Sequence, residues 1–351
     1  MPASPPTESP ADIPVRYGPE TLDYLQQQVV GRDREAQLVV AALMAGRHLL
    51  LEGPPGTGKS TLLRSVSQSS DQPFELVEGN AELTPARLIG HFDPAQVLEA
   101  GYVPDVWVDG PLARALRDGG LLYLEEINRI PEETLNVLVT VMSEGEITIP
   151  RLATIAAHPN FRLVAAMNPF DAVGTARISG AVYDRVCRIS MDYQSTADEI
   201  EIATRHGANL LSQAWPANDH PSTAASLSLP VFIDRVVELT RATRSHPEIR
   251  VGSSVRGAVD LLLLAGPLST LRSLPPASRD VGLDAALTAL SGRVRVHESS
   301  NLTAEQIITD LWHEIMERPE VTSEDSDDGD QADQSPGKLQ SRRAAGTTTT
   351  S

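Results

Sequence analysis

A run of eight residues, Gly53-Pro-Pro-Gly-Thr-Gly-Lys-Ser60, has the residue types and the spacing of a loop that binds phosphate groups. Glycines lack a Cβ atom, so successive backbone N–H groups can converge on phosphate oxygens, and the following helix adds partial positive charge. We expect Lys59 to reach the β- and γ-phosphates of a nucleotide and the Ser60 hydroxyl to bind Mg²⁺. The apolar run 48–51 and the helix-like segment 61–66 supply the strand and the helix that this pattern requires.

Two adjacent carboxylates, Glu125 and Glu126, follow the apolar run 121–124, which we predict to be a buried parallel strand. In a sheet that also carries a phosphate loop, acids at this strand end handle Mg²⁺ and the attacking water. We expect Glu125 to face the metal shell and Glu126 to orient or deprotonate water. The alternative is a pair of helix-capping acids before Pro131.

Two further residues are ambiguous when each is taken alone. The strand-like run 161–167 ends in Asn168, whose amide is placed to hold water against a γ-phosphate, but an Asn before Pro169 is also a common start of a turn. Arg185 lies near the end of a short helix-like segment before the strand 188–191. On its own, Arg185 is typical of a solvated cation at a helix C-terminus.

Composition limits the class of protein. The chain has 351 residues, 41% of them hydrophobic, and a net charge of −18, which is the composition of a soluble protein with room for two domains. Cys187 is the only cysteine, which excludes an intrachain disulfide and favours a reducing cytoplasm. We expect no membrane span and no signal peptide. The acidic charge argues against nucleic-acid binding, because such binding neutralises phosphates.

The pattern of apolar and polar residues divides the chain into five segments. They are a disordered N-terminus (1–18), an α/β nucleotide-binding core (19–211), a linker (212–229), a small all-α domain (230–318) and a disordered acidic tail (319–351). In the core we predict two short helices between 19 and 46 and a hairpin at 146–156. We also predict capping boxes at Thr196…Glu199 and Thr303…Gln306, each starting a helix.

Taken together and in this order, the motifs resemble those of the AAA+ ATPases, and within them the MoxR-type ATPases of the helix-2-insert group. The resemblance spans residues 22–317, and the motifs that carry it are Leu51 to Ser60, Leu124 to Arg129, Ala165 to Pro169, Asp184-Arg185 and Gly252 to Arg256. The fold that the resemblance implies is a P-loop αβα sandwich with a parallel sheet, followed by a small all-α lid domain.

The resemblance also implies roles for single residues. Asn168 falls at sensor 1, Arg185 at the arginine finger that acts on a neighbouring subunit, and Arg256 at the sensor-2 arginine of the lid. The expected nucleotide-binding residues are Gly53, Pro54, Pro55, Gly56, Thr57, Gly58, Lys59, Ser60, Thr61 and Arg256. The expected metal residues are Ser60 and Glu125, and the expected catalytic residues are Lys59, Glu126, Asn168 and Arg185. An insertion within 82–109 and the hairpin 146–156 face partners or a central pore in this group.

The function implied is ATP hydrolysis with Mg²⁺ in a ring, taken as a hexamer, that remodels partner proteins, commonly ones with a von Willebrand factor A domain. One departure is that Glu125 stands where the family usually has Asp, which displaces the carboxylate by about 1.5 Å. We expect nucleotide binding to survive this change and the rate of turnover to depend on it. Three alternatives remain: a slow nucleotide-switched scaffold, a nucleic-acid motor and a simple P-loop kinase.

Overall fold

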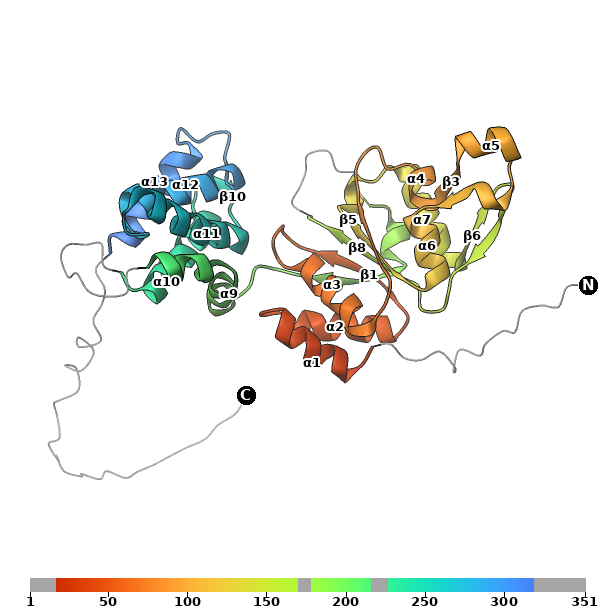
Figure 1. Ribbon diagram of the computed structural model, residues 1–351, viewed down its shortest axis with the longest axis horizontal. Helices are drawn as coiled ribbons and strands as arrows, with labels where there is room; N and C mark the ends of the chain where they lie inside the picture. The colour runs from red at the N-terminus through yellow and green to blue at the C-terminus, as the bar shows by residue number, and fades with distance from the viewer. Residues whose placement is uncertain (1–16, 170–177, 216–226, 319–351) are drawn as a thin grey trace, which may run out of the picture.

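The computed structural model describes residues 17–169, 178–215 and 227–318, which form an α/β core followed by a helical domain (Figure 1). The predicted disorder of residues 1–18 and 319–351 falls almost wholly outside the described residues, as do residues 216–226 of the predicted linker. In the described ranges, no helix combines the length and the apolar composition needed to cross a membrane.

A five-stranded parallel sheet organises the core. Its strands, in spatial order, are β2 (Phe74–Glu78), β5 (Leu121–Glu125), β8 (Arg162–Met167), β1 (His48–Glu52) and β9 (Val186–Ser190). Every neighbouring pair is parallel, so the carboxyl ends of all five strands meet at one edge of the sheet. The predicted buried strands are confirmed, because the central residues of β1, β5 and β8 are all buried.

Helices cover both faces of this sheet and make the core a three-layer αβα sandwich. Helices α1 (Pro19–Gln28), α2 (Asp33–Met44) and α3 (Lys59–Ser70) share one buried cluster with Leu49 and Leu51 of β1. Helices α6 (Pro111–Asp118), α7 (Glu132–Glu144) and α8 (Gly180–Tyr183) share a second cluster with Leu50. Because successive side chains of a strand point to opposite faces, both faces of β1 are buried. The predicted fold class is confirmed.

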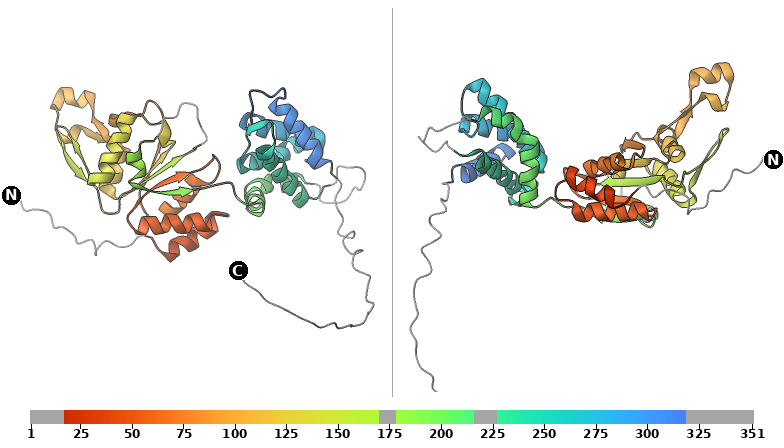
Figure 2. Two further views of the ribbon diagram at one scale, coloured as in Figure 1. Left: turned by 180° about the vertical axis from the view of Figure 1, so that it is seen from behind. Right: turned by 60° about the horizontal axis from the view of Figure 1, so that its bottom comes forward.

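Two excursions leave the sandwich. The first contains α4 (Pro85–Ile89), β3 (Gly90–Phe92), α5 (Pro94–Ala100), the 3-10 turn η1 (Pro104–Val106) and β4 (Trp107–Asp109), with β3 and β4 antiparallel. It projects from the core (Figure 2). The second is the antiparallel hairpin of β6 (Glu146–Ile149) and β7 (Ala153–Ala156), which confirms the hairpin predicted at 146–156.

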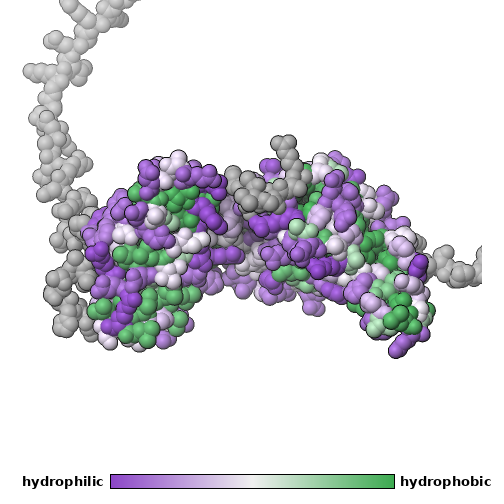
Figure 3. Space-filling model, turned by 90° about the horizontal axis from the view of Figure 1, so that it is seen from above, coloured by the Kyte–Doolittle hydropathy of each residue, from purple (hydrophilic) through white to green (hydrophobic). Residues whose placement is uncertain are grey.

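The first excursion exposes apolar side chains to solvent. Leu98 on α5 is 90% exposed, and Tyr102, Val103 and Val108 are exposed as well. Seen from above, apolar residues lie on the surface at the outer end of the core (Figure 3). Exposed apolar side chains that gather in one place are typical of surfaces that contact other molecules.

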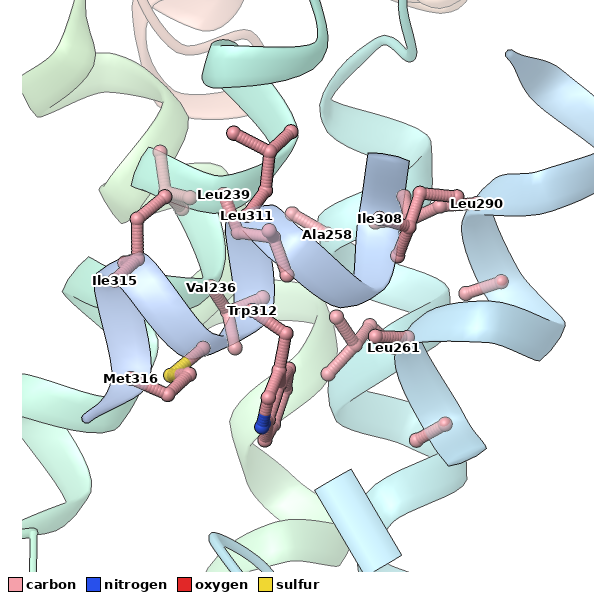
Figure 4. Close-up of a cluster of buried hydrophobic side chains, with 14 of the residues drawn as sticks. Val236, Leu239, Ala258, Leu261, Leu290, Ile308, Leu311, Trp312, Ile315 and Met316 are labelled. Carbon is pink, nitrogen blue, oxygen red and sulfur yellow. The ribbon is translucent and has the colours of Figure 1, made fainter. Parts of the chain in front are cut away.

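The helical domain is built around a single apolar cluster. Its helices are α9 (Thr196–Ala214), α10 (Leu229–Ser245), α11 (Val255–Arg272), α12 (Asp284–Leu290) and α13 (Ala304–Met316), with η3 (Arg279–Leu283), η4 (Ser291–Arg293) and the strand pair β10 (Ile249–Val251) and β11 (Arg295–Val296) between them. Trp312 of α13 lies among aliphatic side chains of the other helices (Figure 4). The capping box at Thr303 and Gln306 is confirmed.

Helix α9 packs with the helical domain, whereas the division drawn from the sequence assigned residues 196–211 to the core. Ala203 and Leu211 belong to the apolar cluster of the helical domain. Gly207 lies so close to α11 that an added Cβ would be 2.8 Å from the Cβ of Leu262. An amphipathic pattern shows that one face of a helix is buried but does not show which domain buries it.

The start of α9 also differs from the prediction. The N-cap is Ser195, whose side chain accepts a backbone hydrogen bond at 3.2 Å. Glu199 does not close a capping box with Thr196; it is 1% exposed and pairs with Arg241 and Arg244 of α10, each at 2.8 Å. Two guanidinium groups compensate the buried carboxylate more strongly than a cap would, so the capping-box prediction at this position was wrong.

His48 joins two central strands through its side chain. Its Nδ1 atom accepts a hydrogen bond from the backbone N–H of Leu163 at 3.0 Å. Burial lowers the pKa of His48 to about 4, and the nearby charges of Arg162 and Arg47 act in the same direction. The neutral ring is therefore part of the folded core.

We expect this histidine to make the folded state sensitive to acid. Because its pKa is lower when folded than when unfolded, its contribution is complete above pH 6.5 and decreases as the pH falls toward 4. Between pH 7 and 4.5 the loss amounts to about 2–3 kcal/mol of the free energy of unfolding. Urea unfolding of the natural protein and of His48→Asn, whose oxygen accepts the same bond without titrating, measures the difference.

The exposed His91 of β3 supplies the matched control, since His91→Asn leaves the buried ring in place. We expect His91→Asn to keep the natural pH dependence and His48→Asn to flatten it. Equal slopes for the natural protein and His48→Asn would contradict the assignment.

Candidate active site

The phosphate loop connects β1 to α3 and depends on its glycines. Gly56 and Gly58 have φ angles of 78° and 86°, which are left-handed conformations that favour glycine. Gly58 is also the N-cap of α3. Thr57 is fully buried, and its hydroxyl donates to the Pro54 carbonyl at 3.0 Å. These contacts fix the curvature of the loop at the N-terminus of α3, where anions bind favourably.

Lys59 lies folded over this loop. Its Nζ atom donates to the carbonyl oxygens of Gly53 and Pro54, each at 2.8 Å. Burial lowers the pKa of Lys59 to about 8, although the carboxylates of Glu126 and Glu125 act in the opposite direction. The side chain is therefore held where the loop would receive phosphate, and its charge is sensitive to nearby anions.

The two predicted metal residues lie in contact. Ser60 Oγ donates a hydrogen bond to Glu125 Oε1, and the Tyr123 hydroxyl donates to the same oxygen at 3.0 Å. Burial raises the pKa of Tyr123, so its hydroxyl stays protonated. A serine hydroxyl beside a carboxylate is an oxygen donor set of the kind that Mg²⁺ prefers. The residues present therefore fit a magnesium ion.

Glu126 and Asn168 lie at the same edge of the sheet. Glu126 adopts a left-handed conformation with φ 51°, which is uncommon for a residue other than glycine, and its carboxylate is 3.4 Å from Arg129. Asn168 follows β8, the strand between β5 and β1. The backbone N–H of Gly53 donates to the Met167 carbonyl at 3.1 Å, which brings the start of the phosphate loop beside the chain leading into Asn168.

The two predicted arginines lie in different places. Arg256, at the start of α11, lines one cavity of about 290 Å³ together with Gly56, Gly58 and Thr61. Arg185 follows α8; among the described residues its hydrogen bonds go to Ser143 Oγ at 2.5 Å and to the Ala181 carbonyl at 2.8 Å rather than to the phosphate loop. The fold thus places Arg256 beside the phosphate loop of its own chain, whereas Arg185 is hydrogen-bonded to residues of α7 and α8.

The remainder of that cavity lies between the core and the helical domain. Val29, Val30, Ile202 and Val259 give it apolar walls, which suit the faces of a nucleotide base. Gln194 also lines it, and among the described residues the buried Oε1 atom of this side chain has no hydrogen-bond partner. Gln194 was not identified from the sequence.

Arg32 is a second residue that the sequence did not single out. It is 4% exposed, and it donates to the Thr57 carbonyl at 3.0 Å and to the Asp192 carbonyl at 2.5 Å. It therefore fastens the phosphate loop to the end of β9. Its only signal was its position in the break between two predicted helices, which is also typical of an exposed turn residue.

The chain is similar to several known proteins. Residues 48–186 match the family described as the AAA domain, dynein-related subfamily. The chain is 28% identical over 259 residues to the uncharacterized protein YeaC of Bacillus subtilis, covering 70% of this chain and 77% of that protein. It is 29% identical over 262 residues to gas vesicle ATPase GvpN1 of Halobacterium salinarum, covering 70% of each. Among solved structures, the RuvB Holliday junction branch migration motor of Thermotoga maritima matches with a TM-score of 0.48 and 17% identity, covering 76% of this chain and 74% of that one.

The lowered pKa of Lys59 predicts that nucleotide binding takes up a proton in alkaline solution. The free lysine loses its proton as the pH rises through about 8, whereas phosphate contacts hold the proton in the complex. At pH 9 we expect uptake of close to one proton per ATP bound, and above pH 8 an affinity that falls by up to about tenfold per pH unit. Calorimetric titration in two buffers of different ionisation enthalpy measures the uptake.

The control is Lys59→Arg, because a guanidinium stays charged at this pH and should remove the proton uptake. Binding at pH 9 without proton uptake by the natural protein would contradict the prediction.

Proposed function

The chain belongs to the AAA+ ATPases, whose domain model its residues 48–186 match, and we propose that it hydrolyses ATP between the subunits of a ring, taken as a hexamer. The observation that carries this proposal is the separation of the two arginines. Arg256 lines the cavity beside the phosphate loop of its own chain, whereas Arg185 donates hydrogen bonds to Ser143 and Ala181. A site that needs both arginines therefore takes the second from another copy of the chain.

Within one subunit, residues of the loop and the lid hold the phosphates of ATP. In this proposal Gly53 to Thr61 surround them, Lys59 exchanges its two carbonyl contacts for the β- and γ-phosphates, and Arg256 approaches from the lid. Mg²⁺, held by Ser60 with Glu125 beside it, would neutralise phosphate charge when bound. The contact between Ser60 and Glu125 supports this assignment.

Glu126 and Asn168 would act on water. The side chains of adjacent residues point in different directions, so Glu126 would face the water while Glu125 faces the metal. The left-handed backbone of Glu126 supports this role, because strained conformations cluster at active sites. Asn168, at the end of the neighbouring strand, would orient the same water against the γ-phosphate.

Arg185→Ala tests the arrangement between subunits. An arginine supplied in trans stabilises charge in the transition state, so we expect turnover to fall by roughly 10³-fold or more while ADP affinity stays unchanged. Because the arginine comes from another subunit, the specific activity of the natural protein should also fall on dilution. Steady-state ATP hydrolysis across a concentration series and fluorescent ADP titration measure both effects.

Arg34→Ala on the exposed face of α2 is the matched control and should keep natural turnover. If Arg185→Ala hydrolyses ATP at the natural rate, or if specific activity does not change on dilution, the ring mechanism is wrong. Uniformly slow turnover in the natural protein would instead favour the nucleotide-switched scaffold, for which Glu125 in place of Asp is the supporting observation.

We further propose that the ring uses ATP to remodel or mature a partner protein in the cytoplasm, and that this partner carries a von Willebrand factor A domain. The resemblance to MoxR-type ATPases is the basis of this part. The exposed Leu98, Tyr102 and Val103 of the insertion support a protein contact at this end of the core. The acidic charge of the chain weighs against a nucleic-acid motor.

Affinity capture from the native host tests the partner. Glu126→Gln removes the carboxylate that would activate water, so we expect it to bind Mg-ATP and keep the assembled state. Mass spectrometry should then find a protein with a von Willebrand factor A domain on this bait and not on Lys59→Ala. Capture of nucleic-acid-processing proteins alone, or of no ATP-dependent partner, would contradict the proposal.

A further inference from the structure

Glu52 is a buried carboxylate to which the mechanism above gives no role. It is the last residue of β1, its side chain is 8% exposed, and the next residue, Gly53, begins the phosphate loop. Removing a charged carboxylate from water costs free energy unless specific partners compensate the charge. Its partners therefore show what this position does.

Both partners of Glu52 come from the segment that carries Arg185. The Tyr183 hydroxyl, at the end of α8, donates to Glu52 Oε1 at 3.0 Å. Arg188 Nη1, in β9, lies 3.3 Å from Glu52 Oε2. Arg185 stands between these two residues, so one carboxylate holds its segment on both sides.

The backbone of Glu52 is tied to the same region. The Glu52 carbonyl accepts a hydrogen bond from the N–H of Met191 at 2.7 Å, and β1 pairs with β9 so that Leu50 lies opposite Arg188. On the other side, the Gly53 carbonyl accepts the bond from Lys59 Nζ. Glu52 thus stands directly between the phosphate loop of its own subunit and the segment of Arg185.

The exposure of the three side chains shows which of them requires the other two. Tyr183 is 38% exposed and Arg188 is 59% exposed, so each can be hydrated if it moves. Glu52 is buried and cannot be hydrated in the same way. The loss of its partners would leave a buried charge uncompensated, a change that is strongly destabilising. The carboxylate therefore keeps the exposed segment in one position relative to the phosphate loop.

We propose that Glu52 is a positioning residue for Arg185. From the end of β1, directly before the phosphate loop of its own subunit, it holds Arg185 in the position that reaches the ATP bound by the neighbouring subunit. This inference rests on the proposed function, because it requires Arg185 to act in trans. It assigns Glu52, Tyr183 and Arg188 to the activity of the neighbouring site and not to ATP binding in their own.

The variant Glu52→Gln keeps the size of the side chain and removes its charge. We expect turnover to fall by about tenfold to a hundredfold, as for a catalytic group displaced by about 1 Å, with ADP affinity unchanged. Tyr183→Phe and Arg188→Gln, which each remove one partner, should show smaller losses of the same kind. Glu78→Gln, at the exposed end of β2, is the matched control and should keep natural turnover.

Mixed rings distinguish action on the neighbour from action on the same subunit. Lys59→Ala subunits lack a working site but offer a natural finger, whereas Arg185→Ala subunits keep a working site and lack the finger. Mixing Glu52→Gln with Lys59→Ala should raise ATP hydrolysis above the sum of the two separate proteins. Mixing Glu52→Gln with Arg185→Ala should give no increase.

The opposite pattern, an increase with Arg185→Ala only, would place Glu52 in its own nucleotide site and overturn the inference. Natural turnover in Glu52→Gln alone, or no increase with either protein, would overturn it as well. The mixture of Lys59→Ala with Arg185→Ala tests the proposed function separately. If that mixture shows no increase, Arg185 does not act in trans and the failure belongs to the ring mechanism.

Discussion

The close approach of Gly53 to the end of β9 is the constraint on which the site depends. An added Cβ on Gly53 would lie 2.1 Å from the Met191 carbonyl oxygen, so no other residue fits without moving a strand. The N–H of Gly53 also donates to the Met167 carbonyl at the end of β8. The first residue of the phosphate loop is thus fixed between two strand ends, and the loop and α3 take their position from the sheet.

The same strand end leads to the lid. Arg32 holds the Asp192 carbonyl from the core side, at 2.5 Å, whereas the guanidinium of Arg244 in α10 stacks on the Tyr193 ring at 3.9 Å. Asp192 therefore contacts the core, and the next residue, Tyr193, contacts the lid. Arg244 also donates to the Ser253 carbonyl at 2.6 Å, in the loop that precedes α11. One arginine thus connects the segment after β9 to the loop before α11, the helix that carries Arg256 to the cavity beside the phosphate loop.

Local pattern was sufficient for most of the fold and for the centre of the site. The apolar runs of β1, β5 and β8, and the glycine spacing of the phosphate loop, are short-range signals that do not depend on a distant partner. Glu199 and Glu52 could not be interpreted in this way. Each is a charged residue at the border of a predicted element, and only the folded chain shows the arginines that compensate it. Buried charges are stabilised by partners that are distant in sequence, so their neighbours in sequence carry little information about them.

Glu125 shows how such partners change the meaning of a substitution. From sequence, the additional methylene relative to Asp suggests a displaced carboxylate and an impaired metal site. In the structure, Glu125 accepts hydrogen bonds from both Ser60 and Tyr123, and Tyr123 lies two residues earlier on the same face of β5. The position of the carboxylate is therefore determined by two hydroxyl groups and not by side-chain length alone. A longer acid that is anchored in this way keeps its carboxylate at Ser60, so the departure from Asp is compatible with the proposed metal site.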